Sequence, residues 1–351
     1  MKNNKLKPPP HFRNQDQEVG IVNRAKEEAI LMLDMQSELK AMTEEELFKS
    51  KKSVKKLLKQ SGSEGGFGAK PQPKINKEKR TIFTGGPLDN HGYGAVIVEE
   101  GVVRINQVLN QETAVNLLEY INILLEQSQA EVAEGKALQA ERFANVLVKK
   151  HRWDLLLPIY EPSGVIERAL KELLQEDGPI CQVIRSVLGQ NAELYEWAAL
   201  ISDPGSDRQV IHPDIPYLSR DIALLTCFIS LQDIKADMGA TIYLPKTQSA
   251  EHHARNDNKS ERDELLKNTP HKLALLRTGD CAIYDPRVLH AGGSNESANN
   301  TRRVLCYFTF RNTNLPDPRL PNNPGSIREE LKKRQITLPQ LQNMLNSSRL
   351  K

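Results

Sequence analysis

The chain has 351 residues, of which 38% are hydrophobic, and its 48 basic and 45 acidic residues give a net charge of +3 at pH 7. This length and hydrophobic content allow one large or two medium domains with a substantial core and polar extensions. Because basic and acidic residues nearly balance, the total charge does not indicate a protein that binds nucleic acid.

The four cysteines lie far apart in the sequence, and none belongs to a CxxC pair. Most of them are in apolar segments, where a free thiol behaves as a small hydrophobic side chain. The first residues lack the apolar core of a signal peptide, and no stretch of the chain is long and apolar enough to span a membrane. We therefore expect a cytoplasmic protein, with a cleaved organelle-targeting sequence as the alternative.

Residues 1–80 are predicted to form a polar, lysine-rich helical extension that ends in a linker. Apolar residues at three-to-four spacing over residues 21–42 predict an amphipathic helix, and Thr43 with Glu46 as its capping-box partner predicts a second helix. Residues 61–80 are rich in glycine, proline and charge, which is typical of a linker. A solvated extension is favoured over an arm that docks onto a partner or an anionic surface.

The segment after the linker changes to short strands and amphipathic helices. Residues 93–109, "YGAVIVEEGVVRINQVL", predict short strands, and residues 111–127 predict a helix with one apolar face. Two further helices are predicted at 163–175 and 179–188.

From Leu194 onward the chain is rich in β-strand patterns that are separated by turn residues. Many short strands predict a sandwich or barrel, and the preceding helices would cover one face. The polar segment 249–270 is predicted to be a surface loop or lid, and its histidines are not expected to bind metal. The predicted strands lie at 194–202, 208–215, 221–234, 239–245, 271–278, 281–285 and 302–310.

The segment "QVIHPDIPY" holds the first candidate metal ligands. In a strand, His212 and Asp214 would project to one side while Pro213 faces the other. His290, at the end of a predicted strand and before two glycines, is the candidate third ligand. Two imidazoles and one carboxylate leave one side of a metal ion open, as in non-haem Fe(II) oxygenases. The alternatives are a solvated turn for the pair and a histidine bonded to backbone for His290.

The run "TRRVLCYFTFRN" places two arginines at the start of a strand that is apolar on both faces. Arg302 and Arg303 must point to opposite faces, so at least one is expected to be buried. A buried guanidinium needs an anion, and its planar fork fits a carboxylate in bidentate fashion. A solvated strand-end arginine remains the alternative for one of the two.

Four runs together resemble the phytanoyl-CoA dioxygenase family of Fe(II)- and 2-oxoglutarate-dependent oxygenases. They are "QVIHPDIPY", "ISLQDIKADMGATIYLPKTQS", "GDCAIYDPRVLHAGGSNES" and "RRVLCYF", and the likeness covers roughly residues 85–315. The resemblance implies a double-stranded β-helix (jelly roll) core, so the expected fold class is mainly β with flanking helices and an N-terminal helical extension.

The resemblance also implies roles for individual residues. The iron ligands would be His212, Asp214 and His290. Alignment on Phe310 favours Arg303 over Arg302 for the distal carboxylate of 2-oxoglutarate. Thr226, Phe228 and Ser230 would share the face of a strand that helps to form the wall around the co-substrate.

The expected domains follow from these patterns. Residues 1–80 are the extension and linker, and residues 81–325 are the jelly-roll oxygenase domain with a helical insert near 110–190. Residues 326–351 are predicted to be a C-terminal helical tail.

The chain departs from the family pattern at one turn. Lys246-Thr247-Gln248 replaces the usual Gly-Ser-His, which leaves open how that edge of the pocket is supported. Asp214 argues against a related halogenase, where a small residue replaces this carboxylate. Arg152 or Lys150, in "KKHRWDLLLP", would suit an acidic substrate, but a solvated basic turn is favoured.

We therefore expect an Fe(II)/2-oxoglutarate-dependent dioxygenase of secondary metabolism that uses dioxygen to oxidise a small molecule, with release of succinate and CO2. The oxidation could be hydroxylation, desaturation or oxidative cyclisation. Two alternatives remain. One is a cupin-like metal-dependent hydrolase or isomerase. The other is a catalytically inactive jelly-roll binding protein.

Overall fold

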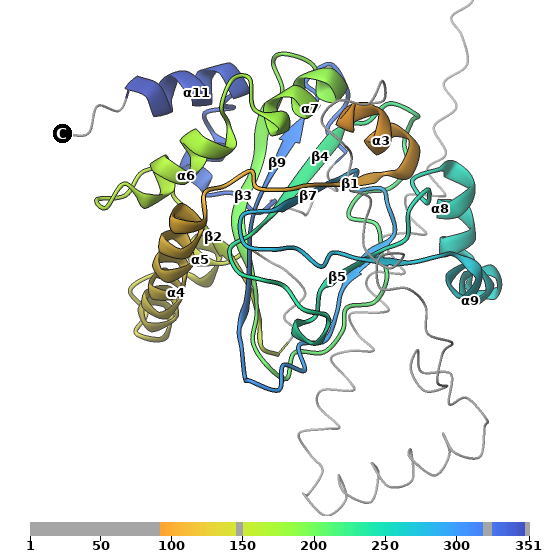
Figure 1. Cartoon of the computed structure of the whole chain (residues 1–351), viewed down its shortest axis with the longest axis horizontal. Helices are drawn as coiled ribbons and strands as arrows, with labels where there is room; N and C mark the ends of the chain where they lie inside the picture. The colour runs from red at the N-terminus through yellow and green to blue at the C-terminus, as the bar shows by residue number, and fades with distance from the viewer. Residues whose placement is uncertain (1–91, 145–149, 319–324, 348–351) are drawn as a thin grey trace, which may run out of the picture. The chain divides into compact units, whose positions relative to one another are not determined.

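Figure 1 shows the computed structural model, which describes residues 92–144, 150–318 and 325–347. All of these residues belong to one compact unit, residues 75–351. The extension and linker predicted for residues 1–80 lie outside the described residues.

The described strands form two antiparallel sheets. The larger sheet has six strands in the order β1-β7-β4-β9-β3-β2, and the smaller has three in the order β6-β5-β8. The strands are β1 Val102–Ile105, β2 Arg152–Leu156, β3 Glu193–Ser202, β4 Leu224–Ser230, β5 Thr241–Tyr243, β6 Lys272–Leu273, β7 Cys281–Tyr284, β8 His290–Gly292 and β9 Arg303–Arg311.

Most of the described helices pack on one face of the larger sheet (Figure 1). Buried side chains of α3, α4, α6, α7 and α11 share one core cluster with that face, whereas Leu265 of α9 packs against Leu244 and Leu289 beside the smaller sheet. The helices are α3 Tyr93–Glu100, α4 Gln111–Ala133, α5 Gln139–Arg142, α6 Val165–Leu173, α7 Pro179–Leu188, the 3₁₀ turn η2 Ala236–Met238, α8 Ala250–Asp257, α9 Lys259–Asn268, α10 Glu329–Lys332 and α11 Leu338–Ser347.

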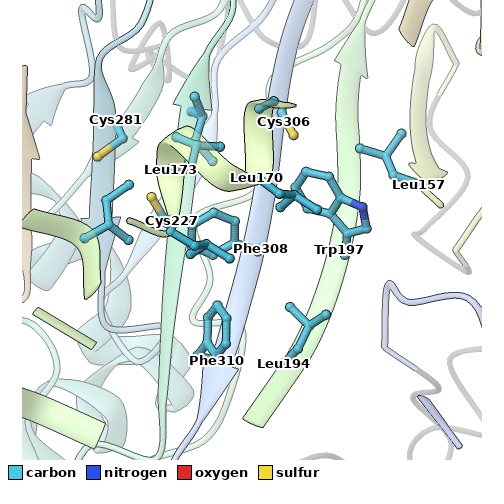
Figure 2. Close-up of a cluster of buried hydrophobic side chains, with 14 of the residues drawn as sticks. Leu157, Leu170, Leu173, Leu194, Trp197, Cys227, Cys281, Cys306, Phe308 and Phe310 are labelled. Carbon is cyan, nitrogen blue, oxygen red and sulfur yellow. The ribbon is translucent and has the colours of Figure 1, made fainter. Parts of the chain in front are cut away.

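Strand β9 lies between β3 and β4, and its side chains alternate between two cores. Figure 2 shows Cys306, Phe308 and Phe310 in the cluster under the helices, together with Trp197 of β3. The opposite face of β9 carries Leu305 and Tyr307, which belong to a second cluster that side chains of both sheets share. Each strand of the larger sheet therefore has a helix-packed face and an inward face, as period-two alternation requires.

The four cysteines are free and buried. Cys227, Cys281 and Cys306 come from three adjacent strands and lie in the helix-packed cluster (Figure 2). This placement agrees with the expectation that they act as small hydrophobic side chains.

The three helices predicted from apolar periodicity are confirmed as α4, α6 and α7. The Asn110 side chain caps α4 by accepting a hydrogen bond from the Glu112 backbone N–H, and Pro179 occupies the first turn of α7. The α11 helix packs on this layer. Its Leu338 N–H donates to the Ala192 carbonyl at 2.8 Å.

Two segments that were predicted to be a strand or a loop form helices instead. Residues 93–100 form the helix α3, because Gly101 ends it with φ of 77° and Gly94 lets it approach α7 closely. The polar segment 249–270 contains the helices α8 and α9 rather than a loop, and Ser249 and Asn258 cap them. Helix and strand are therefore both prominent in the described part, which corrects the expectation of a mainly β protein.

The segment around the first histidine is also not a regular strand. In the predicted strand 208–215, only His212 forms a β-bridge, and of 271–278 only Lys272–Leu273 is a strand. In each of these segments only one or two residues pair with a neighbouring strand. None of the described helices is long and apolar enough to cross a membrane, and the cytoplasmic location stays a prediction.

We predict that Phe308→Ala lowers the free energy of unfolding by about 3–5 kcal/mol, because it leaves a cavity in the helix-packed core. Phe308 is 1% exposed. Urea denaturation followed by circular dichroism measures the change. The matched control is Leu138→Ala at a side chain that is 71% exposed, which should shift stability by less than about 0.5 kcal/mol. Equal losses in the two variants would contradict the assignment of this core.

Candidate active site

The structure brings His212, Asp214 and His290 together. They are the one cluster of three metal-binding side chains found among the described residues, with ligand atoms all within 4.8 Å of one another. A two-bond backbone bridge joins the histidines: the His212 N–H donates to the His290 carbonyl at 2.9 Å, and the reverse bond is 3.0 Å. Asp214 is anchored close by, since its N–H donates to the Pro286 carbonyl at 2.8 Å.

Backbone carbonyls orient both imidazole rings. His212 Nδ1 lies 2.7 Å from the Val210 carbonyl oxygen, and His290 Nδ1 lies 2.9 Å from that of Val288. A carbonyl only accepts hydrogen bonds, so each Nδ1 carries the proton and each Nε2 carries a lone pair. This tautomer is the one in which Nε2 can bind a metal ion.

Both Nε2 atoms face the Asp214 carboxylate. His212 Nε2 is 3.5 Å from Oδ1, and His290 Nε2 is 3.4 Å from Oδ2. The three side chains are thus grouped closely enough to be candidate ligands of one metal ion. Burial raises the pKa of the Asp214 carboxyl, but when the imidazoles are protonated their charge and hydrogen bonds outweigh this effect and hold the pKa well below its usual range. The ligand is therefore ionised.

Tyr284 on the inward face of β7 contacts two members of the triad. Its hydroxyl donates to Asp214 Oδ2 at 2.9 Å, and its ring lies edge-on to that of His290 with centroids 5.0 Å apart. Burial raises the pKa of this phenol well above its ordinary value, so it stays a donor. Tyr284 thus holds the carboxylate in place.

Thr247 supports the strand that carries His290. Its hydroxyl donates to the Leu244 carbonyl at 2.6 Å and accepts from the Leu289 N–H at 2.8 Å. The turn that departs from the family pattern therefore still ties this edge to β8, through a threonine hydroxyl.

A cavity of about 250 Å³ opens at the triad. His290 is 6% exposed and lies on its inner side, whereas the Asp214 side chain is 38% exposed. Thr226 and Phe228 are among the residues that line the cavity, and Ser230 is not. The other lining residues are Ala144, Asp154, Tyr195, Glu196, Leu200, Gln209, Ile215, Leu224, Thr241, Tyr284, Pro286, Gly292, Tyr307, Gly325 and Ser326.

Arg303 is fully buried on the inward face of β9. Its Nη1 donates to the Gly239 carbonyl and its Nη2 to Ser202 Oγ, so its described partners are neutral. Its Nε has no hydrogen-bond partner among the described residues. Burial and the nearby Arg152 lower the pKa of this guanidinium to about 9, which leaves it charged at neutral pH.

Tyr243 provides a second unpartnered donor in the same region. It is fully buried, its ring stacks on His290 with centroids 5.8 Å apart, and no described group bonds to its hydroxyl. Burial raises the pKa of the phenol well above its ordinary value. Thr241, two residues earlier on the same face of β5, lines the cavity.

Two other arginines considered from the sequence, Arg302 and Arg152, bond to groups outside the metal site. Arg302 points away from Arg303 and forms an ion pair with Asp203, so it does not share the pocket. Arg152 is not a solvated basic turn, since it is buried in β2 and donates to Ser202 Oγ and to the carbonyls of Asp207 and Gly293. None of the three arginines, Arg303 included, is among the described residues that line the cavity.

The wall formed by β2, β3 and β9 carries a buried carboxyl, Asp154. Both of its oxygens accept from the Tyr307 hydroxyl, at 2.9 and 3.0 Å, and Oδ2 accepts from Ser326 Oγ at 2.5 Å. Glu196 of β3 lies near it and accepts from Thr309 Oγ1 at 2.6 Å. The cavity is thus polar on this side.

Sequence reasoning missed Asp154, Tyr243 and Tyr284. The signal for Asp154 was an acidic residue inside the apolar run "RWDLLL", two positions after Arg152. Tyr284 itself lines the cavity, and Tyr243 shares a strand face with Thr241, which lines it too. An aromatic side chain on a strand is, however, most often part of the core. No sequence feature distinguishes these two tyrosines from ordinary core residues.

The donors in this site fit Fe(II) and 2-oxoglutarate. Two imidazoles and one carboxylate suit a first-row transition metal with open positions. The unpartnered Arg303 Nε and Tyr243 hydroxyl, both buried, are the kind of donors that a carboxylate requires. When bound, the metal and the oxo acid would supply the oxidising chemistry.

The chain is similar to known dioxygenases and to solved structures of α-ketoglutarate-dependent proteins. The chain is 24% identical to dioxygenase aneA of Aspergillus aculeatus over 60% of this chain and 73% of that protein. It is 29% identical to dioxygenase FrzG of a Cladobotryum species over 36% of this chain and 43% of that protein. The structure of the non-haem α-ketoglutarate-dependent carbocyclase SnoK from nogalamycin biosynthesis aligns with TM-score 0.48 and 18% identity, over 71% of this chain and 94% of that one.

A family model identifies the chain and confirms the resemblance seen in the sequence. The model of the phytanoyl-CoA dioxygenase family matches residues 97–304, which is more than half of the chain and contains the triad and Arg303. The chain therefore belongs to the phytanoyl-CoA dioxygenase family and is a 2-oxoglutarate-dependent non-haem iron oxygenase.

Proposed function

We propose that this enzyme oxidises a small molecule in the cavity beside the triad, with Fe(II) bound by His212, Asp214 and His290. Arg303 and Tyr243 bind the distal carboxylate of 2-oxoglutarate. When bound, Fe(II), 2-oxoglutarate and dioxygen would supply the oxidising chemistry, with release of succinate and CO2.

The wall of this pocket is proposed to follow the sequence expectation in part. Thr226 and Phe228 on the inward face of β4 line the cavity beside the co-substrate. The two antiparallel sheets correspond, in this proposal, to the two halves of a double-stranded β-helix. Hydroxylation is the default outcome. Desaturation and oxidative cyclisation use the same site with a different placement of the substrate.

The observation that carries the proposal is the burial of Arg303 without an acidic partner. A buried charge is normally paired with an opposite one, and the structure describes no carboxylate bonded to this guanidinium. A metal-dependent hydrolase or isomerase has no need of such a charge beside its metal. An inactive binding protein would have no need of the histidine tautomers that present both Nε2 atoms to the carboxylate.

We predict that anaerobic addition of Fe(II) and 2-oxoglutarate to the full chain produces the weak visible charge-transfer band of the iron chelate. His290→Ala should abolish the band and most Fe(II) affinity, because a facial site that keeps two protein ligands binds iron poorly. Equilibrium dialysis measures Fe(II), and circular dichroism checks the fold. His253→Ala, at a histidine outside the triad, is the control and should keep the band. A His290→Ala protein with undiminished iron binding would contradict the assignment.

We predict opposite behaviour for the two adjacent arginines. Arg303→Ala should retain Fe(II) but raise the Kd for 2-oxoglutarate by about 30-fold or more, since losing one partner of a buried charged pair costs about 2–5 kcal/mol. Arg302→Ala should change it by less than about threefold, because its ion pair with Asp203 is partly exposed and such pairs contribute about 0–1 kcal/mol. Titration of the charge-transfer band compares the two variants. If Arg302→Ala weakens 2-oxoglutarate binding more than Arg303→Ala does, the face of β9 that carries Arg302, not the one that carries Arg303, points into the pocket.

A further inference from the structure

The cavity has an electrostatic feature that the chemistry at the iron does not use. Among the described residues that line it, none is a lysine or an arginine, whereas three are acidic. Asp214 belongs to the metal triad. Asp154 and Glu196 lie on the wall formed by β2 and β3, away from the metal ligands in sequence and in strand order.

Asp154 is 4% exposed and forms no ion pair with a described residue. Its hydrogen-bond donors, the Tyr307 and Ser326 hydroxyls, are neutral. A structural carboxyl at this depth would normally face a basic side chain, because a buried charge is costly unless it is paired. Arg152, two residues earlier on the same strand, could be such a partner. Its guanidinium instead donates hydrogen bonds to Ser202 Oγ and to backbone carbonyls.

None of the other charged groups of the loaded site bonds to Asp154. In the proposed complex, the two positive charges of Fe(II) and the one of Arg303 balance the two negative charges of 2-oxoglutarate and the one of Asp214. Arg152, Asp154 and Glu196 lie outside this balance, and the Arg152 guanidinium donates to neutral groups rather than to the Asp154 carboxylate. Burial, with smaller contributions from Glu196 and Asp214, raises the pKa of the Asp154 carboxyl to about 7, against the hydrogen bonds that lower it. The ionised form of Asp154 is therefore strongly stabilised when a positively charged group binds next to it.

We propose that Asp154 determines substrate specificity by binding a protonated amine of the substrate, so that the substrate class is organic molecules with a basic nitrogen. This proposal rests on the proposed function of the cavity, and it replaces the acidic substrate that Arg152 or Lys150 would have suited. Tyr307 and Ser326 hold the carboxyl toward the cavity. Glu196 adds negative potential, but the inference depends on Asp154 alone.

Three probes with one carbon skeleton test the proposal. They are cyclohexylmethylamine, cyclohexylmethanol and cyclohexanecarboxylate, which differ in charge at neutral pH. Each is titrated into the full chain with Fe(II) and 2-oxoglutarate under anaerobic conditions. Calorimetry gives the Kd, and the charge-transfer band shows in the same sample that the iron complex has formed.

The wild-type protein should bind the amine at least about 10-fold more tightly than the alcohol, and the carboxylate most weakly, because hydrogen bonds between charged groups in a buried site are the strong ones. Asp154→Asn keeps the shape but removes the charge, so it should bring amine and alcohol to within about twofold. Asp203→Asn removes a carboxylate outside the cavity and is the matched control with an unchanged preference.

The results separate this inference from the proposed function. If the band forms but the wild-type protein binds the alcohol or the acid as tightly as the amine, or binds none of the three, the assignment of Asp154 is wrong while the oxygenase site stands. The same holds if Asp154→Asn retains the amine preference. If the band does not form in the wild-type protein, the proposed function fails first.

Discussion

The backbone bridge between His212 and His290 is the contact on which the site depends. It joins a segment that is not part of a regular strand to the edge of the smaller sheet. Two further backbone bonds extend it, from the Gln209 N–H to the Gly292 carbonyl at 2.9 Å and from the Asp214 N–H to the Pro286 carbonyl at 2.8 Å. Backbone bonds leave the side chains free, so both imidazoles and the carboxylate can converge on one point. The Nδ1 contacts then select the tautomer, and Tyr284 restrains the carboxylate.

The inward face of the larger sheet separates charge along the strand direction. At one end, Arg152 and Arg303 meet and share Ser202 Oγ as an acceptor, with no described carboxylate between them. Asp154 lies two residues after Arg152 on β2. It accepts a hydrogen bond from Tyr307, which lies four residues after Arg303 on β9. The basic end suits the anionic co-substrate and the acidic end suits a cation. The triad lies beside both, which is where a reaction between two bound molecules requires it.

Sequence patterns predicted the parts that repeat along the chain. The apolar periodicity of α4, α6 and α7 gave their positions because each buries one continuous face. Alternation gave the two sets of side chains on opposite faces of β9, and the family resemblance then favoured Arg303 for the inward set. The spacing of His212 and Asp214 was informative although no regular strand forms there. The helix α3 was missed because its run of valine and isoleucine resembles a strand, and Gly101 and the packing on α7 override that preference. Asp154, Tyr243 and the shared Ser202 could not be predicted, because their roles depend on neighbours from distant strands.

The two faces of the larger sheet have opposite effects on stability, and this explains how the inward face can be so polar. A buried donor without a partner costs about 1–3 kcal/mol, and both the Arg303 Nε and the Tyr243 hydroxyl are in this state. An aromatic side chain in the helix-packed core, such as Phe308 or Trp197, contributes about 3–5 kcal/mol. One such side chain on the outer face therefore offsets about one unpartnered donor on the inner face. The same strand, β9, carries Phe308 and Arg303 on opposite faces, so the rigid core that tolerates the buried charge also fixes its direction. A slip of one residue in the register of β9 would turn Arg303 into the helix layer and Phe308 into the cavity, and both faces would lose their function together.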